Sequence, residues 1–391
     1  MTAWDVGALA SPLTGAFLYH DTAHSLAAEG SPGERWPVVE GIPFLRADRT
    51  ELAREALVRL DSGDEAGALA SLLADQDGWA RTPPPPLADR TRLVREAESL
   101  GFRDACTLLG YGPVGTYFAH RWSDPTYLSG LALAEAYWPG ALPVFELACG
   151  PGHFLAAFAR AGAPVAGGDL VFSKLWLARR YLAPEARLIC FDAGAPWPLA
   201  SAAFATVFCH DALYFLPEKP HVAAECLRVA GPEGRVLVGH AHNRLVDNLS
   251  AGAPLAPDEY AALFGGVATL YDDRELTAAL VEGRAPCPAS AEELAKAPAV
   301  ALAAGVAAVG SSRPVVGGLA MPQPGTRLRR NPLYGGDGAI RWPSERYERE
   351  YGPLATYPMH ADAPAEAVAG ADPEVDALAR RRVLVDLPDR W

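Results

Sequence analysis

Apolar and polar positions alternate in blocks through the middle of the chain, from about residue 142 to residue 239. Short apolar runs with the length of buried strands lie at 144–147, 165–169, 188–191, 206–209 and 235–239. Longer stretches that fit helices lie between them, at 154–161, 174–182 and 221–229. Buried strands separated by helices form a parallel sheet that is covered on both faces. The pattern therefore predicts a doubly wound α/β domain.

The residues ahead of this domain are expected to be helical. Thr50 is placed to cap an amphipathic helix, and a stiff proline run follows at 83–86. The last helix of the region is expected to begin at Asp124, with Pro125 in the first helical position. We therefore expect a helical linker and cap over residues 48–141.

The two ends of the chain have a different character. Residues 1–47 form short extended pieces joined by turn-forming residues, and residues from 321 to 391 form a proline-rich extension. The α/β domain then covers residues 142–320. The pattern contains no internal repeat.

Composition narrows the classes of partner. The chain has 391 residues, of which 50% are hydrophobic, and a formal net charge of -13, which disfavours a nucleic-acid partner. Its 6 cysteines form no C-x-x-C pair, so no metal site is predicted and a reducing cytoplasm is expected. No signal peptide is evident, and the most apolar stretch is shorter than a membrane span, so no membrane partner is expected.

A glycine turn after the first predicted strand carries the candidate chemistry. Glu146 lies in the strand at 144–147, and Gly150 and Gly152 follow before a helix begins. Glycine lets the backbone approach a ligand closely, and open parallel sheets bind ligands at the carboxyl ends of their strands. A dinucleotide-binding turn needs a third glycine where this chain has Leu155, so NAD is disfavoured.

Acidic residues end three successive predicted strands. Asp169 lies 23 residues after Glu146, and Asp192 lies another 23 residues on. A carboxylate at Glu146 would repel a pyrophosphate but suits an ammonium group. Asp169 is placed to hold the hydroxyls of a ribose, and Asp192 to accept a hydrogen bond from an adenine amino group. Together the three acids predict a nucleoside ligand with a positive tail and no phosphate.

These pieces resemble the class I S-adenosylmethionine-dependent methyltransferases in order and spacing. The matching motifs are Glu146-x-Ala148-Cys149-Gly150-Pro151-Gly152, Gly168-Asp169-Leu170 and Phe191-Asp192-Ala193. The resemblance implies a Rossmann-like, doubly wound, mainly parallel sheet of seven strands, with S-adenosylmethionine as cofactor and S-adenosylhomocysteine as product. The cofactor-binding residues that it implies are Glu146, Ala148, Gly150, Gly152, His153, Asp169, Leu170, Asp192, Ala193 and His210.

Methyl transfer from a sulfonium has a neutral leaving group, so alignment of the acceptor about 3 Å from the methyl carbon is a large part of catalysis. An oxygen or nitrogen acceptor can also need a base. The catalytic candidates at the ends of the fourth and fifth strands are His240, His242, His210 and Tyr214. Hydrogen-bonded loop histidines are the alternative interpretation. Tyr117 and Arg121 precede the first strand and are candidates for a cap over the cofactor.

Residues 9–45 resemble the small zinc-ribbon activator domain that accompanies some tRNA and protein methyltransferases. Ser11-Pro12-Leu13-Thr14-Gly15 stands where that family has Cys-Pro-x-Cys-Gly. Because the expected cysteines are missing, no zinc is predicted in this small β-rich N-terminal module. It is expected to act as a packing module, as a homodimer contact or as a substrate lid.

The predicted function is S-adenosylmethionine-dependent methylation of a small-molecule acceptor in the cytoplasm, with secondary metabolism as a suggested setting. One alternative is methylation of a protein or an RNA, which a basic groove beside the cofactor would support. Another is a cofactor-binding protein that catalyses a reaction other than methylation, such as a cyclisation.

Overall fold

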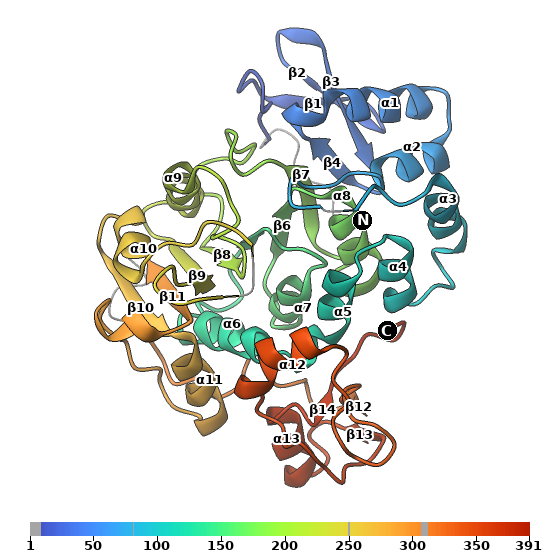
Figure 1. Ribbon diagram of the computed structural model, residues 1–391. Coiled ribbons are helices and arrows are strands. Elements are labelled where there is room, and N and C mark those ends of the chain that lie inside the picture. The colour runs from blue at the N-terminus through green and yellow to red at the C-terminus, as the bar shows by residue number, and fades with distance from the viewer. Residues whose placement is uncertain (1–8, 81, 249–250, 306–311) are drawn as a thin grey trace.

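The computed structural model of the chain describes residues 9–80, 82–248, 251–305 and 312–391 (Figure 1). Its centre is a mixed sheet whose middle strands are parallel. In sheet order, the strands within the described residues are β1 (Leu18–Thr22), β2 (Ser25–Ala28), β3 (Ser31–Val39), β4 (Ile42–Leu45), β7 (Arg187–Phe191), β6 (Val165–Asp169), β5 (Val144–Leu147), β8 (Thr206–His210), β9 (Arg235–His242), β11 (Ala299–Ala304) and β10 (Ala268–Asp272). The fold is a Rossmann-like α/β fold.

The apolar runs predicted as strands form the parallel part of this sheet. All residues of β5, β6 and β8 are buried, as expected for strands that are covered on both faces. The strands from β4 to β9 pair in parallel, whereas β11 and β10 add to the edge in antiparallel orientation. The carboxyl ends of β5, β6, β7 and β8 therefore meet at one edge of the sheet.

The sheet is larger than the seven strands expected for the α/β domain: β7, β6, β5, β8, β9, β11 and β10 come from that domain, and the N-terminal strands bring the sheet to eleven within the described residues. The four N-terminal strands continue it: Phe44 pairs with Cys190 and Leu45 with Phe191, so β4 lies parallel to β7. All four residues of β4 are buried. This apolar run covers the backbone groups that β7 would otherwise expose as an edge strand.

Helices α7 (His153–Arg160), α8 (Phe172–Leu177) and α9 (Lys219–Ala230) follow β5, β6 and β8, as the sequence predicted. The helix predicted over 174–182 begins slightly earlier, at Phe172, and ends at 182 as predicted, with a π-helical last part, Ala178–Leu182. Phe208 of β8 packs against Phe154 and Phe158 of α7, with ring centroids 4.9 and 5.3 Å apart. The helices α10 (Pro257–Leu263) and α11 (Asp273–Glu282) flank β10.

The region ahead of β5 is helical, as predicted, and comprises α1 (Thr50–Asp61), α2 (Glu65–Leu72), α3 (Leu87–Glu96), α4 (Phe102–Leu108), α5 (Pro113–His120) and α6 (Pro125–Ala136). The prediction for α6 is confirmed, because the Asp124 side chain accepts a hydrogen bond from Thr126 N at 2.8 Å. The predicted cap at Thr50 was wrong. A 3₁₀ turn, Ala47–Arg49, leads directly into α1, so Thr50 already lies inside the helix.

The C-terminal extension folds beside the helices of this region (Figure 1). It contains α12 (Glu345–Tyr351), α13 (Pro373–Arg380) and a small sheet in the order β13 (Glu366–Val368), β12 (Arg327–Arg330) and β14 (Leu384–Val385). The last residue is fastened to α5, because Trp391 Nε1 donates to the carbonyl of Ala119 at 2.7 Å. None of the helices in the described ranges has the length and apolar character that a membrane crossing requires.

Candidate functional site

The turn between β5 and α7 is built for close approach of its backbone. Gly150 and Gly152 have φ angles of 53° and 87°, and Ala148 has a φ of 55°, a region that costs a residue with a Cβ about 1–2 kcal/mol. A Cβ added at Gly150 would have only the ring edge of Phe118 near it, at 4.0 Å. At Gly152 it would lie 3.1 Å from the Cβ of Ala178. The turn therefore faces open space at Gly150 and is packed at Gly152.

Glu146 contributes a buried carboxylate beside this turn. The residue is 3% exposed, and its Oε2 has no hydrogen-bond partner among the described residues. Burial raises the pKa of Glu146 well above its usual value, whereas the Leu155 N–H and the Arg121 guanidinium oppose that shift. An unpartnered buried carboxylate oxygen is costly, and the ammonium group of a ligand would satisfy it.

Asp169 joins the second strand to the glycine turn. Its Oδ2 accepts a hydrogen bond from Gly150 N at 2.9 Å, and its Oδ1 accepts one from Val171 N at 2.9 Å. The ammonium group of Lys174 lies 3.7 Å from Oδ1. Each carboxylate oxygen has a second lone pair, so Asp169 can fix the turn and still accept hydrogen bonds from ligand hydroxyls.

Asp192 follows the third strand and caps its own turn, because its Oδ1 accepts a hydrogen bond from Gly194 N at 2.8 Å. Ala193 is buried, and its carbonyl accepts a hydrogen bond from Trp197 Nε1 at 3.0 Å. Leu170 is half-buried directly after Asp169. The predicted adenine contacts of Asp192 and Ala193 stay predictions.

His153 begins α7, but its ring turns away from the glycine turn. The ring is 5% exposed, and its Nε2 donates to the carbonyl of Phe118 at 3.0 Å. It packs edge-on against Trp122, with ring centroids 4.6 Å apart. The side chain thus joins α5 to α7, which leaves the backbone of His153 for the predicted cofactor contact.

Asp211 directly follows β8 and collects several polar groups. The hydroxyls of Tyr117 and Tyr214 donate to its two carboxylate oxygens at 2.6 and 2.7 Å. The Arg121 guanidinium lies 3.8 Å away. Burial alone would raise the pKa of Asp211, but the charges of His240 and Arg121 outweigh it and hold the pKa below the usual range. Asp211 is therefore an ionised carboxylate in a mostly buried setting.

His240 lies near the end of β9 and is held between two carboxylates. Its Nδ1 donates to Asp273 Oδ2 at 2.7 Å, and its Nε2 lies 4.0 Å from Asp211 Oδ1. Burial would lower the pKa of His240, but the two carboxylates outweigh it and raise the pKa to about 9. At that pKa the ring carries a positive charge at neutral pH. Both Asp211 and His240 have positive φ angles, 55° and 49°, a strain that is typical of functional sites.

The other predicted catalytic residues lie in the same cluster. His242 stacks on Tyr214, with ring centroids 4.2 Å apart and an angle of 8°. His210 is buried beside His240, and neither of its ring nitrogens has a hydrogen-bond partner among the described residues. Burial lowers the pKa of His210 to about 3, so its ring is neutral. His210 is better suited to packing than to proton transfer.

Sequence reasoning missed two members of this cluster, Asp211 and Asp273. An acid immediately after a strand end, like Asp169 and Asp192, is a usable signal for Asp211. Asp273 opens α11 and carries no such signal, because only the folding of β10 and β11 onto β9 brings it to His240.

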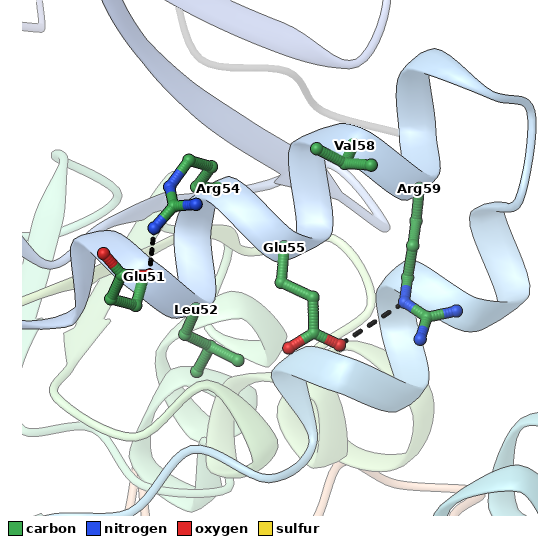
Figure 2. Close-up of a pocket in the computed structure, with 6 residues that line it drawn as sticks. All are labelled: Glu51, Leu52, Arg54, Glu55, Val58 and Arg59. Carbon is green, nitrogen blue, oxygen red and sulfur yellow. Dashed lines mark hydrogen bonds and ion pairs between the residues drawn. The ribbon is translucent and has the colours of Figure 1, made fainter.

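A separate surface groove lies on α1, remote in sequence from these strand ends (Figure 2). It is lined by Glu51, Leu52, Arg54, Glu55, Val58 and Arg59. Its Glu51–Arg54 and Glu55–Arg59 ion pairs follow the helix spacing and are exposed to solvent, which is typical of a solvated helix face. We assign no function to this groove.

Fold and site together define a doubly wound α/β protein with a candidate ligand site at the carboxyl ends of its strands. Residues 145–238 match the family model described as a methyltransferase domain. The chain therefore contains a methyltransferase domain, and the cofactor of this domain is S-adenosylmethionine. The donors present fit this cofactor, because the orphaned Glu146 oxygen matches its ammonium group and Asp169 its ribose.

Solved structures of similar proteins cover about half of the chain. A TehB-like S-adenosylmethionine-dependent methyltransferase from Corynebacterium glutamicum is 18% identical, covers 45% of this chain and 85% of its own, and has a TM-score of 0.32. An S-adenosylmethionine-dependent methyltransferase from Thermotoga maritima is 14% identical, covers 54% and 95%, and has a TM-score of 0.34. The 4+2 cyclase SpnF is 19% identical, covers 47% and 81%, and has a TM-score of 0.34. No curated protein matches the chain.

Proposed function

We propose that this chain is an enzyme that transfers the methyl group of S-adenosylmethionine to an oxygen or nitrogen of a small molecule. The observation that carries the proposal is the buried Glu146 oxygen without a partner, beside a glycine turn that is open at Gly150. This pairing suits the ammonium end of the cofactor. It would be a costly arrangement in a protein that bound nothing there.

In this proposal the cofactor is held by residues at the ends of three strands, β5, β6 and β7. Glu146, Ala148, Gly150, Gly152 and the start of α7 at His153 take the methionine part. Asp169 and Leu170 take the ribose, and Asp192 and Ala193 take the adenine. When bound, the cofactor supplies an electrophilic methyl carbon on a sulfonium.

Arg121 links this region to the acceptor end. Its guanidinium is buried, lies 4.7 Å from the ring centroid of Tyr117 and bonds Asp124 at 2.8 Å. Its positive charge acts to lower the pKa of both Glu146 and Asp211. We propose that Arg121 keeps Asp211 ionised, favours the ionised form of Glu146 once the ammonium group of the cofactor lies beside it, and positions the cluster around Asp211 relative to the cofactor.

The acceptor is proposed to bind at Asp211 and His240. His240 is an imidazolium at neutral pH when no other cation is present, so it would orient an acceptor heteroatom rather than remove its proton. Asp211 is ionised and is placed to receive that proton as the new bond to carbon forms. Tyr214 and His242 support Asp211 by their hydrogen bond and stacking, and His210 packs against His240.

The segments that cover Asp211 leave limited access to it, which favours a small acceptor. The side chain of Asp211 is 16% exposed, and Tyr351 of α12 stacks on Tyr117, which in turn binds Asp211. A protein or RNA substrate would have to displace α12 to reach Asp211. The net charge of -13 also disfavours an RNA.

We propose that residues 9–45, which resemble a zinc ribbon, form a packing module that holds no zinc. Ser11 stands at the position of the first missing cysteine, and its Oγ accepts hydrogen bonds from Leu13 N and Thr14 N, both at 3.0 Å. The same hydroxyl donates to Glu34. A hydroxyl and a carboxylate thus hold the turn that a metal holds in the zinc ribbons. The pairing of β4 with β7 supports a packing role for this region.

Calorimetric titration with S-adenosylhomocysteine tests the cofactor site. We expect micromolar binding by the native protein and at least tenfold weaker binding by Glu146→Gln, which keeps the size of the side chain and removes its charge. Glu233→Gln, at an exposed position after α9, is the matched control and should bind like the native protein. Thermal unfolding checks that all three proteins are folded.

The same protein, incubated with radiolabelled S-adenosylmethionine and pools of small phenols, amines and acids, tests the reaction. Transfer of label to a small molecule supports the proposal. No binding of S-adenosylhomocysteine by the native protein would overturn it. Binding without label transfer, but with conversion of an acceptor, would indicate a reaction other than methylation.

A further inference from the structure

Three side chains at the ends of β8 and β9 converge on one point. Asp211, His240 and His242 each direct one possible ligand atom toward the others, and these atoms all lie within 4.8 Å of one another. We infer that Asp211, His240 and His242 form a binding site for a divalent transition-metal ion. The sequence prediction contained no metal ligand, because these residues lie in two separate segments and form no metal-binding motif.

The geometry of the three residues follows from the sheet. His240 and His242 are two residues apart at the end of β9, and their ring centroids lie 5.1 Å apart. β8 pairs with β9 in parallel, and His210 is the partner of Gly239, so Asp211 follows at the same edge. Ligand atoms bound to one Zn²⁺ at about 2.0–2.2 Å are roughly 3–3.5 Å apart. The widest separation, up to 4.8 Å, must therefore shrink by about 1.3–1.8 Å when a metal binds.

An outer layer of hydrogen bonds orients these ligands. Asp273 accepts the Nδ1 proton of His240 at 2.7 Å, which leaves Nε2 directed toward Asp211. A histidine whose second nitrogen donates to a carboxylate is the usual arrangement for a metal ligand. The hydroxyls of Tyr117 and Tyr214 orient the carboxylate of Asp211 in the same way.

The balance of charge also favours a cation. Within the described part of the chain, the cluster brings together the carboxylates of Asp211 and Asp273 with the Asp124–Arg121 ion pair, in which the guanidinium is bonded at 2.8 Å. The Asp124 and Arg121 charges cancel, so two buried or half-buried carboxylates remain. In the metal-free protein the imidazolium of His240 offsets one of them, and a divalent ion that displaces its proton offsets both. The ligands of this site are buried or half-buried, so it is not a patch of exposed acidic side chains. The inference of a metal site does not depend on the proposed methyl transfer.

The donors select the kind of metal. Two imidazoles and one carboxylate suit Zn²⁺, Fe²⁺, Mn²⁺ or Co²⁺, whereas Mg²⁺ and Ca²⁺ prefer oxygen donors alone. Three protein ligands leave at least one coordination position for an exogenous ligand. The exogenous ligand would be a small molecule with an anionic or hydroxyl oxygen. If the proposed methyl transfer holds, that molecule is the acceptor, and the metal would take over from His240 in holding its heteroatom.

The test measures metal binding by the full chain without any activity assay. All proteins carry Cys287→Ser, because Cys287 is an exposed thiol that could bind metal by itself. They are stripped with a chelator, titrated calorimetrically with Zn²⁺ alone, and analysed for metal by mass spectrometry after gel filtration. Titration with Co²⁺ adds a visible absorption band as a signature of ligation.

We expect about one equivalent of Zn²⁺ per chain, with a micromolar or tighter Kd. Asp211→Asn and His242→Gln should each weaken binding at least tenfold, and Asp273→Asn should weaken it through the orientation of His240. His360→Gln, at an exposed histidine outside the cluster, is the matched control and should bind like the parent. Thermal unfolding shows which variants are folded.

Less than a tenth of an equivalent of Zn²⁺ in the parent protein would overturn the inference, even if a variant failed to fold. Equal affinity in the parent, in folded Asp211→Asn and in folded His242→Gln would overturn it as well. Titration of the stripped protein with S-adenosylhomocysteine separates the two proposals. Binding of this product without binding of Zn²⁺ would support the proposed cofactor site and overturn the metal site. Binding of Zn²⁺ without binding of this product would support the metal site and overturn the cofactor site.

Discussion

The carboxylate of Asp273 accepts a hydrogen bond from Nδ1 of His240 at 2.7 Å, across 33 residues of chain. Asp273 also accepts a hydrogen bond from Ser129 of α6 at 2.9 Å, so the carboxylate itself is held in place. The contact directs Nε2 of His240 toward Asp211. A helix start, a strand end and a second strand end thus cooperate to orient one imidazole at the acceptor end of the site.

The first prediction concerns the proton of that imidazole in metal-free protein. Asp273→Asn should lower the pKa of His240 from about 9 by about one unit or more, because it removes the nearer of two carboxylates. NMR titration of the histidine ring signals measures this pKa. Asp272→Asn is the control, because the neighbouring Asp272 caps α11 through Arg274 N instead. An unchanged pKa in Asp273→Asn would contradict the prediction.

The second prediction concerns the glycine turn. Gly150→Ala should cost about 1–2 kcal/mol of stability, because its φ is 53°, and should weaken binding of S-adenosylhomocysteine at least tenfold. Gly162→Ala is a matched control with a φ of 85°, since its nearest neighbour is the Cβ of Ala141 at 3.8 Å. It should lose similar stability and no affinity. Calorimetry and thermal unfolding distinguish these outcomes, and equal affinity losses would argue against a cofactor contact at Gly150.

The third prediction concerns stability in acid. Burial lowers the pKa of His120 to about 4 and that of His153 to about 3, so the folded state favours both rings in the neutral form. Their contribution is fully present above about pH 6.5 and is lost as the pH falls through that value, by about 1.4 kcal/mol per pH unit for each histidine. Urea unfolding between pH 7 and pH 5 measures this loss. His120→Gln should have a shallower slope than the native protein, and an identical slope would exclude His120 as a cause.

The fourth prediction concerns the cover formed by α12. Tyr351→Ala should destabilise the protein by about 2–4 kcal/mol, because Tyr351 is 8% exposed and stacks on Tyr117 at 6.1 Å. Amide exchange in α12 should become faster, as measured by mass spectrometry. Tyr351→Phe keeps the ring and should behave nearly like the native protein. Unchanged exchange in Tyr351→Ala would mean that other contacts hold α12 over the site.

Local features of the chain were readable from the sequence. The apolar run at 144–147 is strand β5, and the positive φ angles of Gly150 and Gly152 agree with a turn that approaches a ligand. Asp124 caps α6, as its position before a proline predicted. These features depend on residues a few positions apart, and their propensities act without help from the rest of the fold.

The sequence by itself therefore determined the parallel core, the glycine turn and the acids at the strand ends. Only the tertiary structure decided that β4 extends the sheet at β7 and that Asp273 reaches His240. Both contacts join segments far apart in the chain, and their residues have other plausible roles when taken locally. A pattern of neighbouring residues does not show which distant strand edge a strand will pair with, or which distant side chain will bond a buried polar group. That choice is made by packing, because each edge strand and each buried charge needs a partner.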